Sequence, residues 1–259
     1  MRNIAVVTGA SSGIGRKLVE KLDALGLDEI WGIALDEEGL NEVKKETQTK
    51  FVPIQMDLTD ARCLKEYKML LENFKPNISW LINAAGFGKF GSVEEIGTQT
   101  TLNMIDLNIK ALVAFNEYSL PYMSKLGRIV NISSVGAFQP TPFMNVYTAS
   151  KTFVLNYSNA LNVELSGRDI TVTAVCPYWT KTKFFDRAEQ KDNAVVTKYV
   201  AMYESDFVAT KIMKAATKRK LTYVIGTISK LQVMLVKLLP KKFVMWLWVK
   251  QQKLDKRYK

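Results

Sequence analysis

Tyr147 and Lys151 are the residues of this chain best suited by type and spacing to do chemistry. Positions i and i+4 of a helix lie on the same face, so the phenol and the ammonium group would be neighbours. A cation near a phenol favours the phenolate, and we therefore expect the pKa of Tyr147 to lie below the usual value of about 10. Such a phenol can exchange protons near neutral pH. Taken alone, the pair has a second interpretation, as a chance arrangement on a surface helix.

Two hydroxyl groups end a strand that precedes this pair. The run at residues 127–133 is typical of a buried strand, and the chain continues through Ser133 and Ser134. Ser134 lies thirteen positions before Tyr147. Because a hydroxyl at the carboxyl edge of a sheet can hold a carbonyl oxygen, these serines are candidates for the same site.

A glycine-rich segment follows the first apolar run of the chain. Residues 8–15 read Thr-Gly-Ala-Ser-Ser-Gly-Ile-Gly, with a predicted strand before them and apolar residues at helical spacing after them. Glycines let the backbone turn tightly, so that a diphosphate can approach the amide groups and the positive dipole end of the next helix. The alternative is a glycine-rich helix start without a ligand, and the spacing differs from the commoner Gly-x-Gly-x-x-Gly pattern.

The elements that must position these residues alternate between strands and helices. Apolar runs predict strands at residues 4–8, 30–35, 51–56, 79–83, 127–133, 170–176 and 221–225. Helical spacing predicts helices that include residues 18–25, 40–43, 64–71, 101–124, 145–166 and 207–212. This order predicts an α/β fold, a doubly wound parallel sheet (Rossmann-like), with its ligand site at the carboxyl ends of the strands. We expect one domain, residues 1–226, and a basic amphipathic helical extension, residues 227–259.

Composition excludes several classes of protein. The chain has 259 residues, 47% of them hydrophobic and 24% charged, as in an ordinary folded protein. It has no histidine, which excludes Ser-His-Asp hydrolysis and histidine-ligated metal catalysis, and we expect no metal. Cys63 and Cys176 are predicted to be buried thiols. The apolar start of the chain is too short for a signal peptide, and no run reaches the roughly 18 apolar residues of a membrane span, so we expect a cytoplasmic protein.

The positive charge of the chain is concentrated at its end. The formal net charge is +11, but residues 218–259 contain twelve Lys or Arg and a single acid, Asp255. Residues 1–217 hold 24 basic and 24 acidic residues. The excess charge therefore belongs to the extension and not to the predicted domain, and we expect no nucleic-acid partner.

In combination, these motifs resemble those of the short-chain dehydrogenase/reductase family, in its single-domain branch, over nearly all of residues 4–226. The resemblance implies a catalytic tetrad: Asn108, Ser134, Tyr147 and Lys151. By resemblance, Tyr147 exchanges a proton with the substrate oxygen, Ser134 fixes and polarises that oxygen, and Lys151 holds the nicotinamide ribose and lowers the pKa of the tyrosine. Asn108 would anchor a water molecule in the proton relay. The implied reaction interconverts a secondary alcohol and a ketone by hydride transfer to or from NAD or NADP.

The resemblance also implies the residues that contact the cofactor. They belong to the glycine-rich segment, the ends of later strands and the catalytic helix: Thr8, Gly9, Ser11, Ser12, Gly13, Ile14, Gly15, Asp57, Leu58, Asn83, Ala84, Gly86, Tyr147, Lys151, Pro177, Thr180 and Thr182. Two residues depart from the family pattern. Ala84 replaces the second asparagine of the Asn-Asn-Ala-Gly motif, and Tyr178 replaces the glycine of the Pro-Gly-x-x-x-Thr segment beside the nicotinamide.

The preference between NADP and NAD depends on the end of the second strand. Where the family has an acidic residue for NAD the chain has Ala34, and where it has a basic residue for NADP the chain has Leu35. Ser12 replaces another frequent basic residue, which leaves Arg16 or Lys17 as candidates to bind a 2′-phosphate. Because no carboxylate at position 34 repels that phosphate, we favour NADP, with NAD as the alternative.

Apolar residues favour a large hydrophobic substrate. The family's substrate lid corresponds to residues 183–205, which face a loop at residues 138–144. Their large apolar residues are Phe184, Phe185, Val195, Val196, Tyr199, Met202, Phe138, Pro140, Phe143 and Met144. Such a lining suits a small-molecule ketone or alcohol of hydrophobic character, such as a steroid, bile acid or lipid-derived carbonyl, although core or subunit contacts explain it equally well. Two other functions stay open: a regulator that binds the nucleotide without turnover, and a module that binds membrane surfaces.

The extension combines apolar and basic residues. Its first part has apolar residues at helical spacing: Leu231, Met234, Leu235, Leu238 and Leu239. After Pro240, residues 243–249 form an aromatic run flanked by lysines. Such a segment suits peripheral contact with an anionic membrane. The alternative is a helix pair that packs over the pocket or on a partner subunit, and the family resemblance implies a homo-oligomer.

Overall fold

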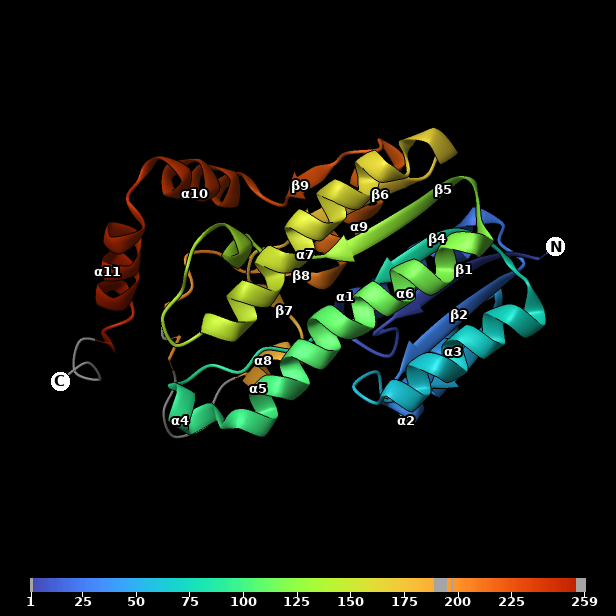
Figure 1. The fold of residues 1–259 in the computed structure, drawn as a ribbon, viewed down its shortest axis with the longest axis horizontal. Coiled ribbons are helices and arrows are strands. Elements are labelled where there is room, and N and C mark those ends of the chain that lie inside the picture. Colours follow the sequence, from blue (N-terminus) through green and yellow to red (C-terminus); the bar gives the residue numbers. More distant parts are fainter. Residues whose placement is uncertain (1, 189–194, 197, 255–259) are drawn as a thin grey trace.

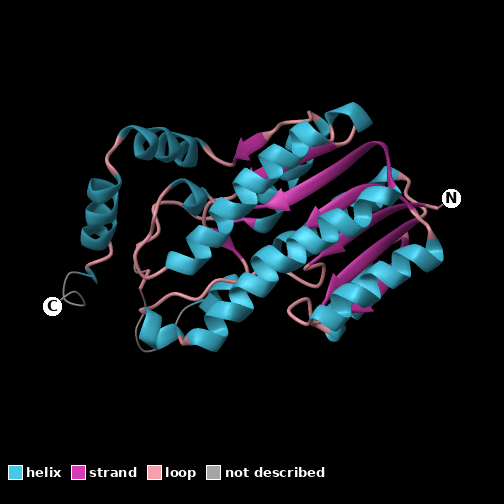
Figure 2. Cartoon of the chain, in the orientation of Figure 1, coloured by secondary structure: helices cyan, strands magenta, loops and turns pink. Residues whose placement is uncertain are grey.

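The computed structural model describes residues 2–188, 195–196 and 198–254, which form a layered α/β fold (Figures 1 and 2). Parallel strands make the central sheet: β1 (Asn3–Thr8), β2 (Glu29–Ala34), β3 (Lys50–Gln55), β4 (Asn77–Asn83), β5 (Met123–Ile132), β6 (Thr171–Cys176) and β9 (Thr222–Val224). Their order in the sheet is β3-β2-β1-β4-β5-β6-β9, so the strand order reverses between β1 and β4. The crevice beyond the carboxyl ends of these two strands is where such sheets bind ligands.

Helices cover both faces of the sheet (Figure 1). One face packs against α1 (Gly13–Leu22), α2 (Glu37–Glu46) and α9 (Ser205–Thr217). The other packs against α3 (Ala61–Phe74), α6 (Leu112–Ser119) and α7 (Asn145–Glu164). Because both faces are covered, β2 and β6 are buried along their whole length, which explains their largely apolar sequences.

The predicted strands are confirmed, and most of their ends shift by one or two residues. The largest difference is in β5, which begins at Met123 instead of residue 127. The irregular stretch after β6 contains three short elements that apolar spacing does not predict: β7 (Thr180–Lys181), α8 (Phe184–Ala188) and β8 (Tyr203–Glu204). The short helix α4 (Val93–Ile96), which begins with a Ser92 capping box, is likewise absent from the prediction.

The helix predicted at residues 101–124 is a composite. α5 (Thr98–Ile105) continues into a π-helical segment, Asp106–Ala111, and then into α6. A 3-10 turn at Leu120–Tyr122 ends it before β5. A π-helical segment adds a residue to the turn and re-aims the side chains there, and such segments are frequent at functional sites.

The two cysteines differ in burial. Cys176, at the end of β6, is buried as predicted. Cys63 lies in the first turn of α3 and is only half-buried, because that turn packs against the core along one side. Both are free thiols.

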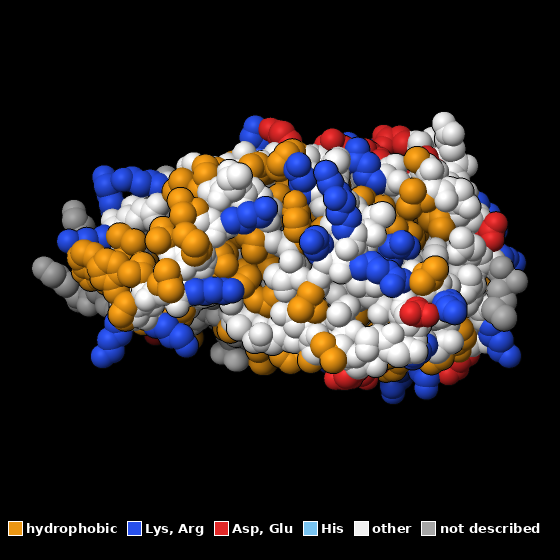
Figure 3. All heavy atoms as spheres, turned by 90° about the horizontal axis from the view of Figure 1, so that it is seen from above, with side chains coloured by type: hydrophobic (Ala, Val, Ile, Leu, Met, Phe, Trp, Pro, Cys, Tyr) orange, Lys and Arg blue, Asp and Glu red, His pale blue; other side chains and the backbone are white. Residues whose placement is uncertain are grey.

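Two helices follow the last strand of the sheet. α10 (Thr227–Leu238) and α11 (Lys241–Gln251) lie at the end of the molecule toward which the strands point their carboxyl ends (Figure 1). Figure 3 shows hydrophobic side chains gathered at this end, with lysines among them. Within the described ranges, no helix has the length and apolar character needed to cross a membrane.

Candidate active site

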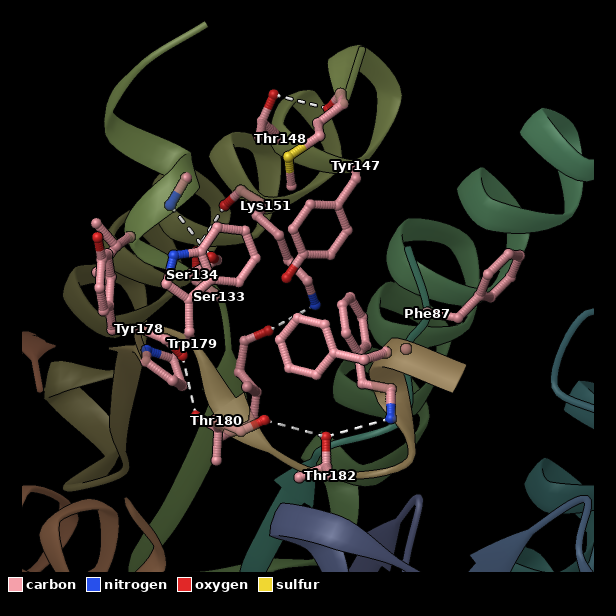
Figure 4. Close-up of a pocket in the computed structure, with 18 of the residues that line it drawn as sticks. Phe87, Ser133, Ser134, Tyr147, Thr148, Lys151, Tyr178, Trp179, Thr180 and Thr182 are labelled. Carbon is pink, nitrogen blue, oxygen red and sulfur yellow. Dashed lines mark hydrogen bonds between the residues drawn. The ribbon is translucent and has the colours of Figure 1, made fainter. Parts of the chain in front are cut away.

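A large cavity opens at the carboxyl ends of the strands. Its volume is about 1060 Å³, and it extends from the glycine-rich segment after β1 to helices α10 and α11. Figure 4 shows the part around the start of α7, where side chains from α7, from the end of β5 and from the segment after β6 converge. The expected cofactor site and the space beneath the C-terminal helices therefore belong to one continuous cavity.

Two glycines of the glycine-rich segment lie too close to other backbone atoms to carry a side chain. Gly9 has a φ of 69°, and a Cβ there would lie 2.9 Å from Ala85 N. A Cβ on Gly15 would lie 2.1 Å from the Gly9 carbonyl oxygen. Helix α1 begins at Gly13, and its N-cap residue, Ser12, makes no side-chain capping bond to the described residues. Because the first turn of α1 lines the cavity, its amide groups fit the diphosphate of a dinucleotide.

Tyr147 and Lys151 lie near the start of α7, and both line the cavity (Figure 4). Lys151 Nζ donates a hydrogen bond of 2.9 Å to the carbonyl oxygen of Ile132, at the end of β5. The same nitrogen lies 5.9 Å from the centroid of the Tyr147 ring. The Tyr147 side chain shares a hydrogen bond with Ser134. The fold thus brings together three side chains of the predicted tetrad.

Ser133 and Ser134 differ in their contacts. Ser133 is buried, and its hydroxyl donates a hydrogen bond of 2.7 Å to the backbone oxygen of Lys151, which ties β5 to α7. Ser134 Oγ accepts a hydrogen bond of 3.1 Å from Gly136 N and also contacts the phenol of Tyr147. Of the two serines, Ser134 is therefore the one with its hydroxyl beside the phenol of Tyr147, and it is the serine that the family resemblance places in the tetrad.

Asn108 lies in the π-helical segment, behind the cavity wall. Its Oδ1 accepts a hydrogen bond of 3.1 Å from Phe87 N, and its Nδ2 donates to Phe87 O at 2.9 Å and to Ser150 Oγ at 3.1 Å. A Cβ on Gly86 would lie 3.0 Å from Asn108 Oδ1 and 3.3 Å from Lys151 Nζ. The amide of Asn108 therefore holds the segment after β4 against α7, close to the lysine.

Most of the predicted cofactor contacts line the cavity: Gly9, Ser11, Ser12, Gly13, Ile14, Gly15, Asp57, Leu58, Ala84, Gly86, Tyr147, Lys151, Pro177, Thr180 and Thr182. The side chains of Thr8 and Asn83 instead lie behind its wall. Thr8 Oγ1 accepts a hydrogen bond of 3.1 Å from Ala85 N. Asn83 Nδ2 donates one of 2.8 Å to Asn131 Oδ1. These two side chains connect neighbouring strands beneath the site.

The model of the short chain dehydrogenase family matches residues 3–193, which include every element described above up to α8. The chain belongs to the short-chain dehydrogenase/reductase family. It is an NAD(P)-dependent oxidoreductase.

Similar proteins share the fold of this dehydrogenase over most of its length. A probable short-chain type dehydrogenase/reductase of Helicobacter pylori is 30% identical over 260 residues, which cover 92% of this chain and 93% of that protein. The structure of a short-chain dehydrogenase from Sphingobium yanoikuyae in complex with NADPH matches with a TM-score of 0.77 at 28% identity, over 90% of this chain and 92% of that one. The bulky-bulky ketone specific alcohol dehydrogenase of Comamonas testosteroni matches with a TM-score of 0.73 at 25% identity, over 92% of each chain.

The pKa of Tyr147 in this dehydrogenase lies above its usual value, whereas the sequence predicts a pKa below it. Burial raises the pKa of Tyr147 to about 12 and outweighs the lowering effect of the hydrogen bond from Ser134. Lys151 does not reverse this, because its ammonium group is directed to the carbonyl oxygen of Ile132. Burial also lowers the pKa of Lys151 to about 8, which weakens its charge. The expectation of a lowered tyrosine pKa is therefore wrong for this geometry.

Replacing Lys151 by methionine should change how stability depends on pH. The pKa of Lys151 is about 8 in the folded dehydrogenase, against 10.5 for an ordinary lysine. Between these pH values the unfolded chain binds more protons than the folded one, so the wild type gains stability as the pH rises, by roughly 3 kcal/mol at most. The variant lacks this gain. In urea titrations we therefore expect the free energy of unfolding of the variant to fall progressively behind that of the wild type as the pH rises over this range.

Lys65→Met is the matched control, because Lys65 lies exposed on α3. This variant shows what the loss of a lysine side chain does to the urea titrations where no burial is involved. A difference for Lys151→Met that does not change with pH would mean that burial does not perturb its ammonium group.

The cations suggested for a 2′-phosphate are paired with carboxylates. Arg16 Nη2 lies 2.7 Å from Glu46 Oε1, and Arg16 Nη1 lies 3.0 Å from Glu42 Oε2. Lys17 Nζ lies 2.8 Å from Glu20 Oε1. A 2′-phosphate would have to compete with these carboxylates for either cation. The preference for NADP over NAD therefore stays a prediction.

The apolar residues of the predicted lid and of the facing loop lie in the cavity wall, in a hydrophobic cluster, or in both. Phe184, Phe185 and Met144 line the cavity. Phe143, Val195 and Val196 pack in a hydrophobic cluster with Trp248 of α11, and Phe184 and Met144 belong to this cluster as well. The residues in the cavity wall are placed as a substrate lining requires, and the substrate-lid interpretation stays a prediction. Residues 189–194 and 197 of this segment lie outside the described residues.

Aromatic residues that spacing does not single out pack around Tyr147, with Trp179 in the cavity wall and Phe90 buried behind it. The Phe90 ring lies 6.2 Å from the Tyr147 ring and 6.3 Å from that of Trp179, both nearly edge-on. Phe90 follows β4 in a segment with three glycines, at residues 86, 88 and 91. Its place just after a strand at the carboxyl edge of the sheet is the signal that could have identified it.

The C-terminal helices form a further wall of the cavity. Trp248, on α11, lines it and donates a hydrogen bond of 3.1 Å from Nε1 to the Pro142 carbonyl oxygen. Gln252 Oε1 accepts from Lys198 N at 3.0 Å, and its Nε2 donates to Lys198 O at 3.1 Å. These bonds attach the extension to the lid segment. The helix pair therefore packs over the pocket, which is one of the alternatives predicted from the sequence.

Proposed function

We propose that this dehydrogenase interconverts a secondary alcohol and a ketone on a bulky apolar substrate, with NADP or NAD. The observation that carries the proposal is the apolar compartment beside Tyr147 and Ser134. Its walls come from the segment after β6 and from the two C-terminal helices: Trp179, Phe184, Phe185, Leu231, Leu235, Leu247 and Trp248. A cavity with such walls binds a large ligand through apolar contact and orients it through few polar groups. The match to an alcohol dehydrogenase described as specific for bulky ketones supports this size of substrate.

The tetrad has a division of labour that needs no histidine. A bound nicotinamide supplies or accepts the hydride. Tyr147 gives a proton to the carbonyl oxygen in reduction and removes it from the alcohol in oxidation, while Ser134 holds that oxygen by a hydrogen bond. Lys151 would hold the nicotinamide ribose of a bound cofactor. Asn108 keeps the segment after β4 in place and would anchor a water molecule of the proton relay. A homo-oligomer remains a prediction from the family.

Nicotinamide absorbance tests the proposal. Purified enzyme is offered NADPH or NADH with a panel of steroid, bile-acid and aliphatic ketones, with cofactor binding followed separately by fluorescence. Consumption of a bulky ketone supports the proposal, and the faster cofactor settles the preference. Cofactor binding without consumption of any ketone or oxidation of any matching alcohol would favour the alternative of a nucleotide-binding regulator.

Trp248→Ala should weaken binding of a bulky ketone more than it slows turnover. Trp248 is almost fully buried and faces the cavity, so its loss removes apolar contact surface for the substrate. We expect KM for the best ketone to rise about tenfold with kcat changed less, which corresponds to roughly 1.4 kcal/mol.

The neighbouring Trp246→Ala is the matched control. Trp246 lies on the same helix but is 50% exposed and does not line the cavity. Its KM for a water-soluble ketone should equal that of the wild type. Equal KM values for both variants would place the substrate away from α11.

A further inference from the structure

The C-terminal helices expose apolar side chains that the fold leaves uncovered. We call Leu231, Met234 and Leu238 on α10, with Phe243 and Trp246 on α11, the outer face. Leu238 is 77% exposed, and each of the others is at least 44% exposed. In Figure 3 hydrophobic side chains gather at this end of the molecule. Contiguous apolar patches of this kind mark sites of interaction rather than ordinary protein surface.

The orientation of α10 is the reverse of an ordinary surface helix. Its buried residues are Ser229 and Val233, one helical turn apart. Met234 and Leu238 lie on the opposite side by helical spacing and point away from the body of the protein, and Leu231 lies between them and the residues of α10 that line the cavity. A surface helix normally turns such residues inward. The sequence of α10 is therefore fitted to an apolar environment outside the protein.

The helices that carry the outer face also carry lysines. Lys250 Nζ lies 4.5 Å from the centroid of the Trp246 ring, and Lys237 Nζ lies 5.3 Å from that of Phe138. Lys241 and Lys242 are exposed at the start of α11. Between Lys218 and Leu254 the sequence has no acidic residue. A partner that fits this surface is a layer with an apolar interior, which contacts the apolar side chains, and an anionic boundary, which contacts the lysines.

A second copy of the chain is a poorer complement than a lipid layer. In a two-fold symmetric contact the same patch meets itself, so each cluster of lysines would face another one. An anionic bilayer offers acyl chains to the apolar residues and negative head groups to the lysines. Tryptophan and lysine side chains are also typical of helices that lie in the interface of a membrane.

The mouth of the cavity lies on the same helices. Ile228, Leu231, Leu235 and Leu247 line the cavity, and each is also at least 44% exposed. Leu231 belongs both to the cavity lining and to the outer face, so apolar side chains connect the two. A molecule dissolved among acyl chains would meet these apolar side chains as it enters the cavity.

We propose that α10 and α11 dock this dehydrogenase on the surface of an anionic lipid bilayer, with the cavity mouth against the lipid. The helices lie in the interface and do not cross the membrane. Delivery of a lipid-dissolved ketone or alcohol through this mouth rests on the proposed function, whereas docking itself does not.

Co-sedimentation of the full-length chain with vesicles tests the proposal. The vesicles are phosphatidylcholine alone or an equal mixture of phosphatidylcholine and phosphatidylglycerol. We expect binding to the anionic vesicles, weak binding to the neutral ones, and a decrease with added salt. Equal binding to both kinds of vesicle, or to neither, would overturn the proposal.

Two pairs of variants locate the contact. Met234→Gln with Leu238→Gln should weaken binding about tenfold or more, because neither residue lines the cavity and both are on the outer face. Their control, Leu25→Gln with Met69→Gln, replaces one leucine and one methionine that are also exposed, at 47% and 58%, outside the outer face. Neither pair should change turnover of a water-soluble substrate. Retention of vesicle binding by the first pair would overturn the proposal.

Charge reversal tests the electrostatic part. Lys241→Glu with Lys242→Glu should also weaken binding about tenfold or more. The control is Lys44→Glu with Lys45→Glu, another adjacent and exposed pair, on α2.

Sedimentation velocity without lipid tests whether the outer face binds a second copy of the chain. The wild type could form a dimer, bind no vesicles, and lose the dimer when Met234→Gln and Leu238→Gln are introduced. That result would assign the outer face to a second copy of the chain instead. Vesicle binding without any ketone turnover would refute the proposed function and leave the docking intact.

Discussion

Tyr147→Phe is expected to lower kcat by about 100- to 10,000-fold, the usual range for loss of a general acid or base. The substitution keeps the ring, which packs against Phe90 and Phe184, and removes only the hydroxyl that contacts Ser134. The apolar wall and the dinucleotide site therefore stay in place. The dissociation constants of NADPH and NADH, measured by fluorescence titration, should change little, while steady-state absorbance assays report the loss of turnover.

Tyr157→Phe is the control on the same helix. The Tyr157 hydroxyl is buried and has no hydrogen-bond partner among the described residues, and its ring stacks on Phe153. It does not line the cavity, so removing the hydroxyl should leave kcat and KM as in the wild type. If Tyr147→Phe kept more than a tenth of the wild-type kcat, the proton would have to come from another group, and the assignment of the tetrad would fail.

The sequence predicts those features of the site that depend on a short stretch of chain. Residues 8–15 combine a strand end, glycines and a helix start, and this local order alone predicts a diphosphate site there. Tyr147 and Lys151 meet because they are one helical turn apart. Ser134 joins them because the strand that carries it ends at the same edge of the sheet as the other strands, a consequence of parallel βαβ units.

The sequence does not predict features that depend on contacts between residues far apart in the chain. The π-helical segment that aims Asn108 at Phe87 is a change of helical phase with no signal in apolar spacing. The raised pKa of Tyr147 results from desolvation by walls that come from several segments, whereas its spacing to Lys151 indicates the opposite shift. The amphipathic pattern of α10 and α11 predicts helices, but the pairing of Gln252 with Lys198 decides where they lie.

Gly15→Ala is expected to remove dinucleotide binding and to destabilise the fold. A Cβ on Gly15 would lie 2.1 Å from the carbonyl oxygen and 2.7 Å from the carbonyl carbon of Gly9, both backbone atoms that cannot turn aside as a flexible side chain can. Either α1 must move away from the loop or the loop must open, and both displace the amide groups that face the cavity. We expect at least about a 100-fold loss of NADPH and NADH affinity, or roughly 2.7 kcal/mol. Overpacking should also cost about 1 to 3 kcal/mol in the free energy of unfolding.

Gly167→Ala separates this steric effect from the general effect of replacing glycine. A Cβ on Gly167 meets nothing within 4 Å among the described residues, and its φ is not in the left-handed region. There the methyl group only reduces the conformational freedom of the unfolded chain, so stability should stay the same or rise by about 0.4 to 1 kcal/mol, with cofactor affinity unchanged. Cofactor titrations and urea unfolding of both variants measure the difference. Undiminished cofactor affinity in Gly15→Ala would mean that the close approach of α1 to Gly9 is not what forms the dinucleotide site, because a binding loop built on that contact cannot absorb a methyl group at its centre.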